Sequence, residues 1–361
     1  MSNFKSSFIR INLVVLLLLN FSNLNAQIEV FKSNLIISDD DLSSFYSSIS
    51  SDSTQVYFNS NDYYLHAFDK KTKNLSWSFY LANKSNTSPK LNKNSVFVEQ
   101  HIGQNYDRCI QLDKKNGDTI QTLRFNSLQT NPIFKDNVVY CAAISPGTGG
   151  AILAYDLEKN KIIWERFIAH GVSTQPYFLK NKIVASAESD NWFEIDYNGI
   201  LKDTLCKNKA SMFVNDIPCI KNFRYLTHDE KEIDEPFLIK HLGETENLKF
   251  FSNQELTVIM GSENLIIIGN NKKIKNKINF LDLKQSFETE SNRYKGIIKI
   301  EGNDFWFFFE NNLVSYDLKT EKAKKIINLS KWKVHQLILE NDNSVAWIIS
   351  KNDGQLYGIK L

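Results

Sequence analysis

The chain has 361 residues, of which 42% are hydrophobic and 23% are charged, and its formal net charge is +2. This is the balance of a globular protein with enough apolar residues for a large core, so it excludes a disordered or fibrous chain. The nearly neutral charge gives no electrostatic reason to expect binding to nucleic acid or to an anionic membrane surface.

The first 26 residues have the layout of a secretory signal peptide. Lys5 and Arg10 form a cationic start, the apolar run Leu13–Leu19 follows, and Ala26 supplies a small residue at the cleavage point. The run is too short to span a bilayer, and no later apolar stretch has that length, so we expect no membrane span. We expect cleavage near Ala26, which leaves residues 27–361 as one domain in the periplasm or secreted.

Prolines recur at a nearly constant interval in the next part of the chain. Pro89, Pro132 and Pro176 each stand two residues after a threonine, and each precedes a short polar break and an apolar run; Pro218 follows after another 42 residues. Proline cannot donate to a sheet ladder and therefore belongs at the first residue of a strand. A repeat of 40–50 residues is typical of propellers and solenoids.

A second landmark lies between the prolines. An alternating strand ends in an aspartate, a short lysine-rich turn follows, and another strand begins. The aspartates that form this column are Asp69, Asp113, Asp156, Asp196, Asp282 and Asp317. One copy is missing from the series, and we place it at residues 235–244, with His241 in the column. Each repeat then predicts one four-stranded antiparallel sheet.

These sheets have apolar runs such as "FWFFF" (Phe305–Phe309), typical of strands that are buried on both faces. Radial stacking covers both faces. We therefore predict an all-β propeller of eight blades, with seven as the alternative, and no convincing helix after the signal peptide. The last repeat ends at Leu361 after its third strand. Residues 28–37 form an unassigned strand, which we expect to join that blade and close the ring.

The four cysteines are Cys109, Cys141, Cys206 and Cys219. In an oxidising compartment they allow two disulfides with three pairings, of which Cys206–Cys219 joins the nearest pair in sequence. They are equally suited to packing as small apolar residues in strands. Their spacing contains no zinc motif, and the acidic run at residues 39–41 lacks the spaced ligands of a calcium loop. We expect no metal site.

The segment "YLHAFDKKTKNLSW" (64–77) resembles the repeat of the PQQ-like, or quinoprotein, β-propellers. In that family a tryptophan docks between neighbouring blades, and Trp77 and Trp164 stand at that position, eight residues after their aspartates. The family contains quinone-dependent dehydrogenases and non-enzymatic members, such as the propeller lipoprotein of the outer-membrane β-barrel assembly machine, which is similar in size. This chain has no adjacent cysteines and no recognisable set of calcium ligands. We therefore expect neither PQQ nor calcium, and the non-enzymatic branch.

The connections between blades end at the innermost strands, so their polar residues are expected to gather at one mouth of the central channel. Ser88, Asn131, His170 and Gln175 are the candidate ligand-binding residues, and the alternative is that they satisfy their own turns. No catalytic motif stands out. We interpret the chain as an exported, non-catalytic scaffold that binds an envelope protein, a glycan or another ligand. The alternative is a channel-mouth enzyme, either a quinone-dependent dehydrogenase or a glycan-active hydrolase or lyase.

Overall fold

The computed structural model describes residues 27–361, apart from a set of short gaps. These gaps are residues 39–41, 43–46, 83–87, 102–106, 126, 129, 146–148, 170–175, 187–190, 202–219, 222–224, 246–247 and 284–294. The expected signal peptide lies outside the described residues, as do Pro218, Cys206 and Cys219.

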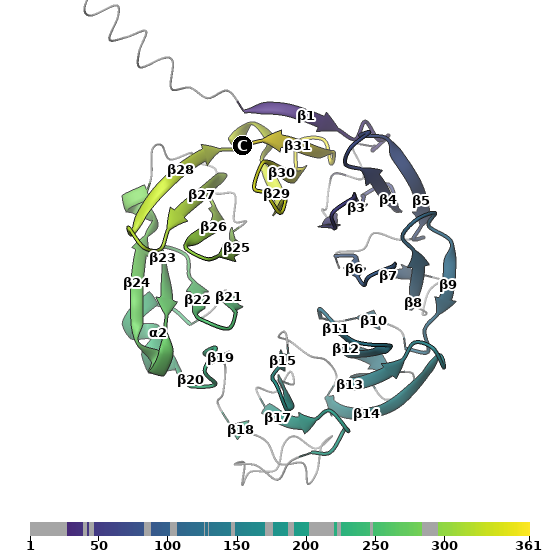
Figure 1. Cartoon of the computed structure of the whole chain (residues 1–361), viewed down its shortest axis with the longest axis horizontal. Helices are drawn as coiled ribbons and strands as arrows, with labels where there is room; N and C mark the ends of the chain where they lie inside the picture. Colours follow the sequence, from purple (N-terminus) through teal and green to yellow (C-terminus); the bar gives the residue numbers. More distant parts are fainter. Residues whose placement is uncertain are drawn as a thin grey trace, which may run out of the picture.

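In the described part of the chain, seven antiparallel sheets of at least four strands stand in a ring around a central axis (Figure 1). We number these sheets blades 1 to 7 in chain order. In blades 1 to 6 the first strand along the chain lies nearest the axis and the last strand lies at the rim, whereas in blade 7 the rim strand comes from the N-terminal end of the described chain. The chain is therefore a β-propeller. The alternative count of seven blades is confirmed, and the count of eight is wrong.

The strands of blades 1 and 2, from the axis outward, are β2 (Ser48–Ser51), β3 (Gln55–Asn59), β4 (Tyr64–Asp69), β5 (Leu75–Tyr80), β6 (Lys90–Leu91), β7 (Ser95–His101), β8 (Asp107–Asp113) and β9 (Thr119–Thr122). Those of blades 3 and 4 are β10 (Ser127–Leu128), β11 (Ile133–Lys135), β12 (Val138–Ser145), β13 (Gly149–Asp156), β14 (Lys161–Ala169), β15 (Tyr177–Phe178), β16 (Lys182–Ser186), β17 (Asn191–Asp196) and β18 (Ile220–Lys221).

The strands of blades 5 to 7 are β21 (Lys249–Ser252), β22 (Thr257–Met260), β23 (Asn264–Ile268), β24 (Ile274–Asn279), β25 (Lys295–Glu301), β26 (Asp304–Phe309), β27 (Asn312–Asp317), β28 (Lys322–Asn328), β29 (Val334–Leu339), β30 (Val345–Ser350) and β31 (Leu356–Lys360), and blade 7 is completed by β1 (Ile28–Lys32). Short 3-10 helices are η3 (Asn270–Lys272), η4 (Phe280–Leu283) and η5 (Ser330–Trp332).

The hydrophobic core lies between the blades. Each of six buried clusters draws its side chains from two neighbouring blades, and the apolar faces of the sheets are thereby covered. Cys109 of blade 2 and Cys141 of blade 3 pack in one of these clusters as free thiols, and burial raises the pKa of both. They behave as small apolar residues.

The prolines of the repeat stand where the innermost strands begin. Pro89 directly precedes β6, Pro132 precedes β11 and Pro176 precedes β15. In blade 3, β10 and β11 both pair with β12, and Pro132 lies in the break between them. The proline positions therefore mark the strands that face the axis, as the sequence predicted.

The aspartate column closes the hairpin between the third and fourth strands. In five blades an Oδ1 atom of this aspartate accepts one or two backbone N–H groups of the following turn, at 2.6–3.1 Å. Such Asx turns satisfy backbone donors that the hairpin leaves unpaired. The same bonds hold the pKa of Asp69, Asp156 and Asp317 below its usual value.

The prediction that the missing copy of the repeat lies at residues 235–244 was wrong. Residues 235–242 form a helix, α2 (Glu235–Leu242), instead of a strand that ends at His241. Asp234 caps its N-terminus by accepting the N–H of Phe237 at 3.0 Å, and Gly243 ends it in the left-handed conformation with a φ of 82°. The helical cap signals and the buried pair at i and i+4, Leu238 and Leu242, outweigh the strand pattern.

The column position assigned to Asp282 was wrong for a related reason. Asp282 lies in η4, after the fourth strand of blade 5, and not in the turn that follows the third strand. In blade 5 that turn is Gly269–Lys273, which closes with a bond from Gly269 N to Lys273 O at 2.8 Å. The step from Asp196 to this turn is therefore longer than one repeat and shorter than two.

A reduced unit fills this extra length. The hairpin β19 (Tyr225–Leu226) and β20 (Glu232–Ile233) leads into α2, and together they lie between blades 4 and 5 (Figure 1). Leu226 packs against Val184 of blade 4, while Leu238 packs in a cluster with Ile266 of blade 5. The two-stranded hairpin and the helix thus supply the apolar layer that an eighth blade would otherwise supply.

The ring closes through the first and last strands. β1 pairs antiparallel with β31, so residues from both ends of the chain share blade 7, as predicted. Phe31 of β1 is 8% exposed and makes edge contacts with Phe68 of blade 1 and Trp347 of blade 7, at ring-centroid distances of 5.2 and 5.3 Å. β1 therefore closes the ring by strand pairing and also fills the interface between blades 7 and 1.

The tryptophan of blade 1 docks onto blade 2. Trp77 is 8% exposed, and its Nε1 donates to the carbonyl oxygen of Lys114 at 2.8 Å. Its ring lies over Gly117, where an added Cβ would be 2.6 Å from a ring atom. Lys114 and Gly117 both belong to the turn that follows Asp113, so one aromatic side chain packs on the turn of the next blade.

Two further blades repeat this contact. Trp164 of blade 3 donates to the carbonyl of Tyr197 in blade 4 at 3.0 Å and lies over Gly199. In blade 2 the corresponding residue is Gln121, and its Nε2 donates to the carbonyl of Leu157 in blade 3 at 2.9 Å. In all three blades the acceptor is the residue directly after the column aspartate. In blade 2, therefore, glutamine makes the docking hydrogen bond that tryptophan makes in blades 1 and 3.

We expect Phe31→Ala to lower the free energy of unfolding by about 3–5 kcal/mol, because it removes a buried aromatic ring at the closure of the ring. Ile28→Ala is the matched control on the same strand: Ile28 is 58% exposed and its truncation should change stability by less than about 0.5 kcal/mol. Urea unfolding of both variants checks this. Equal losses for the two would contradict the role of Phe31.

We expect Gly117→Ala to destabilise the protein more than Gly302→Ala does. Both glycines have a positive φ, 77° and 56°, so both substitutions introduce backbone strain. Only at Gly117 does the new methyl group also meet the ring of Trp77, whereas nothing lies within 4 Å at Gly302. The difference in unfolding free energy should be about 1–3 kcal/mol, and in a Trp77→Ala background it should largely disappear.

Candidate functional site

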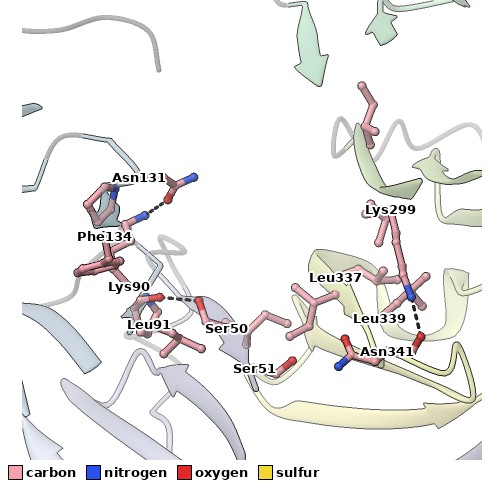
Figure 2. A pocket seen from close by; sticks show the side chains of 16 residues that line it. Ser50, Ser51, Lys90, Leu91, Asn131, Phe134, Lys299, Leu337, Leu339 and Asn341 are labelled. Carbon is pink, nitrogen blue, oxygen red and sulfur yellow. Dashed lines mark hydrogen bonds between the residues drawn. The ribbon is translucent and has the colours of Figure 1, made fainter. Parts of the chain in front are cut away.

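A pocket of about 520 Å³ lies in the centre of the ring (Figure 2). The innermost strands of five blades contribute to its wall: β2, β6 and β11 on one side, and β25 and β29 on the other. The residues that line it are Ile49, Ser50, Ser51, Pro89, Lys90, Leu91, Asn131, Pro132, Phe134, Ile297, Ile298, Lys299, Leu337, Ile338, Leu339 and Asn341. No single sequence motif contains this site, because each of the five blades supplies three or four of these residues.

Hydrogen bonds between neighbouring blades hold the wall in place. Ser50 Oγ donates to the carbonyl of Pro89 at 2.6 Å, which joins blade 1 to blade 2. Gln336 of blade 7 accepts the N–H of Ile49 at 2.7 Å and donates to Ser88 Oγ at 3.2 Å. One glutamine thus connects three consecutive blades. A site built on such strands is held more rigidly than a site on free loops.

Two of the four residues proposed as ligand-binding lie in the described part of the chain. Asn131 lines the pocket, and Ser88 lies directly before Pro89 and is held by Gln336. His170 and Gln175 lie outside the described residues. The two docking tryptophans, Trp77 and Trp164, lie between blades, away from the pocket.

The charged groups of the pocket are two lysines. Lys90 Nζ donates to Asn131 Oδ1 on one side. Lys299 Nζ donates to the carbonyl of Asn341 at 2.6 Å on the other side. Burial lowers the pKa of Lys90, and the charge of Glu99 opposes this effect. Sequence reasoning missed both lysines, since a lysine at the start or middle of a short strand carries no motif; only its place on an innermost strand is a signal.

A second polar array lies on blade 1. His66 is 5% exposed, its Nδ1 is 2.8 Å from Ser78 Oγ and its Nε2 is 2.9 Å from Asp62 Oδ2. One tautomer, with Nε2–H donating to Asp62 and Ser78 O–H donating to Nδ1, satisfies the imidazole completely. None of the three residues lines the channel pocket. The array explains how a histidine is tolerated within a buried strand.

Among the described residues, no group of three or more His, Cys, Asp or Glu side chains is arranged to hold a metal ion. Within the same residues, no helix is long and apolar enough to cross a membrane.

Comparison with known proteins finds similarity in fold and none in sequence. No family model matches the chain, and no curated protein matches it in sequence. Among solved structures, it is similar to the computationally designed Ika8 protein, with a TM-score of 0.59 and 12% identity over 87% of this chain and 95% of that chain. BamB from Moraxella catarrhalis superimposes more loosely, with a TM-score of 0.44 and 15% identity over 87% and 82% of the two chains. At such identities the likeness is one of fold alone.

We expect stability to depend on pH through a half-buried histidine of the innermost strand β29. His335 of β29 lies 3.0 Å, through Nε2, from the carbonyl oxygen of Ser47, just before β2. Burial, with a smaller contribution from the charge of Lys351, lowers its pKa. The unfolded chain therefore binds a proton at a higher pH than the folded chain does. The contribution of neutral His335 to the free energy of unfolding is complete above about pH 6.5, and it is lost as the pH falls through the lowered pKa.

We expect His335→Gln to reduce the loss of stability on acidification, because glutamine can still donate to the Ser47 carbonyl but does not titrate. Urea midpoints at pH 7.5 and 5.5 measure this dependence for the wild type and the variant. The same acid-induced loss in both proteins would show that His335 is not responsible.

Proposed function

We propose that the chain is a non-catalytic binding scaffold whose recognition site is the channel pocket. The observation that supports this most strongly is the convergence of innermost strands from five blades on one cavity of about 520 Å³. A cavity of this size is typical of small-molecule and peptide sites. Its wall combines aliphatic side chains with a few polar groups, which is the composition expected of a site that binds and orients a ligand.

We further propose that the scaffold is exported, and that its partner is a protein or glycan of the cell envelope. The cationic and apolar segments of the first 26 residues support export. The position of β1 is compatible with cleavage after Ala26, since the closing strand begins at Ile28. Processing at this point would leave the pairing of β1 with β31 intact.

The repeat itself is proposed to be of the PQQ-like type. The support is the docking of Trp77 and Trp164 on the turns of the following blades, which is the contact that the resemblance implies. In this proposal the propeller works without bound PQQ or calcium.

We expect the tagged mature chain to capture a specific partner from envelope extracts, and Ser51→Trp to abolish this capture because the indole fills part of the pocket. Ser76→Trp is the matched control, since Ser76 is exposed on the rim strand β5. Quantitative mass spectrometry of the eluates compares the three proteins. Both variants must first be shown to unfold at the temperature of the wild type.

Capture that is unchanged by Ser51→Trp would exclude the channel pocket as the recognition site. Reduction of a dye by the protein in the presence of PQQ, calcium and an alcohol or sugar would overturn the non-catalytic assignment.

A further inference from the structure

The chemistry of the pocket wall indicates what kind of ligand it accepts. Among the described residues that line it, two are lysines and none is an aspartate or glutamate. The whole chain contains 43 lysines and arginines and 41 aspartates and glutamates, so the wall differs in charge from the molecule as a whole. An open cavity walled by strands, with cationic groups and no lining carboxylate, attracts anions.

Lys90 is held in this wall by a neutral partner. Its ammonium group donates to the amide oxygen of Asn131, and the side chain is half-buried. The charge of Glu99 raises the pKa of Lys90. Glu99 Oε1 accepts the N–H of Leu128 at 2.9 Å. Burial lowers the pKa of Lys90 in spite of that carboxylate. The charge of Lys90 is thus incompletely compensated, and an anion in the pocket would stabilise it.

Lys299 faces the same cavity from the opposite side (Figure 2). It donates to the carbonyl of Asn341 at 2.6 Å and forms an ion pair with Glu301 at 2.7 Å. The side chain of Glu301 is 65% exposed, so solvent screens this pair and it contributes little. Lys299 can therefore exchange Glu301 for a ligand at small cost.

Neutral hydrogen-bonding groups lie between the two lysines. Ser50 and Ser51 come from β2, and Asn341 follows β29. Hydroxyl and amide groups of this kind complete the coordination of a carboxylate or phosphate oxygen after a lysine has attracted it. Leu91 and Leu339 also line the wall, and they suit the carbon skeleton of an organic ligand.

We propose that the channel pocket binds a small organic anion, attracted by Lys90 on one side of the wall and by Lys299 on the other. This inference rests on the proposed function, in which the same pocket is the recognition site, and it adds the chemical class of the ligand. Ser51 and Asn341 donate to or orient the anion, Ser50 keeps its bond to the Pro89 carbonyl in the wall, and the aliphatic side chains contact the carbon skeleton of the anion.

The test is isothermal titration calorimetry of the intact mature chain with succinate and with inorganic phosphate. Succinamide is titrated as the uncharged analogue of succinate. Succinate or phosphate is expected to bind saturably in the millimolar range or tighter, and succinamide is not. The anion that binds more tightly shows whether the pocket prefers a carboxylate or a phosphate group on its ligand. Lys90→Met and Lys299→Met are each expected to weaken the tighter anion about tenfold or more.

Lys93→Met is the matched control, since Lys93 is exposed in the turn after β6 and does not line the pocket. It should leave the affinity within about twofold of the wild type, a difference of about 0.4 kcal/mol. Lys90→Arg keeps the charge and should retain binding, which separates loss of charge from loss of folding. No saturable binding of either anion, equal binding of succinamide, or unchanged affinity in Lys90→Met would overturn the proposal.

The outcome is independent of the partner experiment. If Ser51→Trp abolishes partner capture but neither anion binds, the scaffold function stands and the ligand class is wrong. If the anions bind through Lys90 but capture does not depend on the pocket, the anion site stands and the partner binds elsewhere.

Discussion

The structure depends on one constraint: both faces of every blade are apolar and must be covered, either by another blade or, between blades 4 and 5, by the β19–β20 hairpin and α2. A stack with two ends would leave two such faces in water, so the ring has to close. β1 achieves this, because it pairs with β31 and places Phe31 between Phe68 and Trp347. Gln355 strengthens the closure, since its Oε1 accepts both Ser33 Oγ at 2.6 Å and the N–H of Leu35 at 2.7 Å. The pairing of β1 with β31 therefore completes blade 7 and fills its interface with blade 1.

Across the interfaces from blade 1 to blade 4, neighbouring blades are joined by a bond that tolerates changes of sequence. A side chain on the fourth strand donates to the carbonyl that follows the column aspartate of the next blade. Tryptophan makes this bond in blades 1 and 3, and glutamine makes it in blade 2. A tryptophan demands glycine in the facing turn, whereas the turn facing Gln121 contains Asn160 with a φ of 49°. Glycine in one blade is thus explained by the side chain of the blade before it.

The same arrangement creates the binding site. Because the blades stand radially, their first strands converge, and residues that are about 40 residues apart in sequence become neighbours. Lys90 and Asn131 meet in this way, and Lys299 faces them across a pocket whose wall is held by Gln336 and Ser50. The rigidity of the closed ring therefore determines the precision of the site.

The sequence by itself determined the type of fold and the closure of the ring. The prolines before β6, β11 and β15, the aspartate turns and the unassigned strand expected at residues 28–37 are local signals, since each depends on backbone chemistry within a few residues. The blade count was decided by tertiary structure. Leu238 and Leu242 pack as a helix face against blade 5, and the hairpin with α2 replaces a complete blade because it covers the same apolar surface. The site was also decided there, because whether a lysine faces the channel depends on the position of its strand in the closed ring.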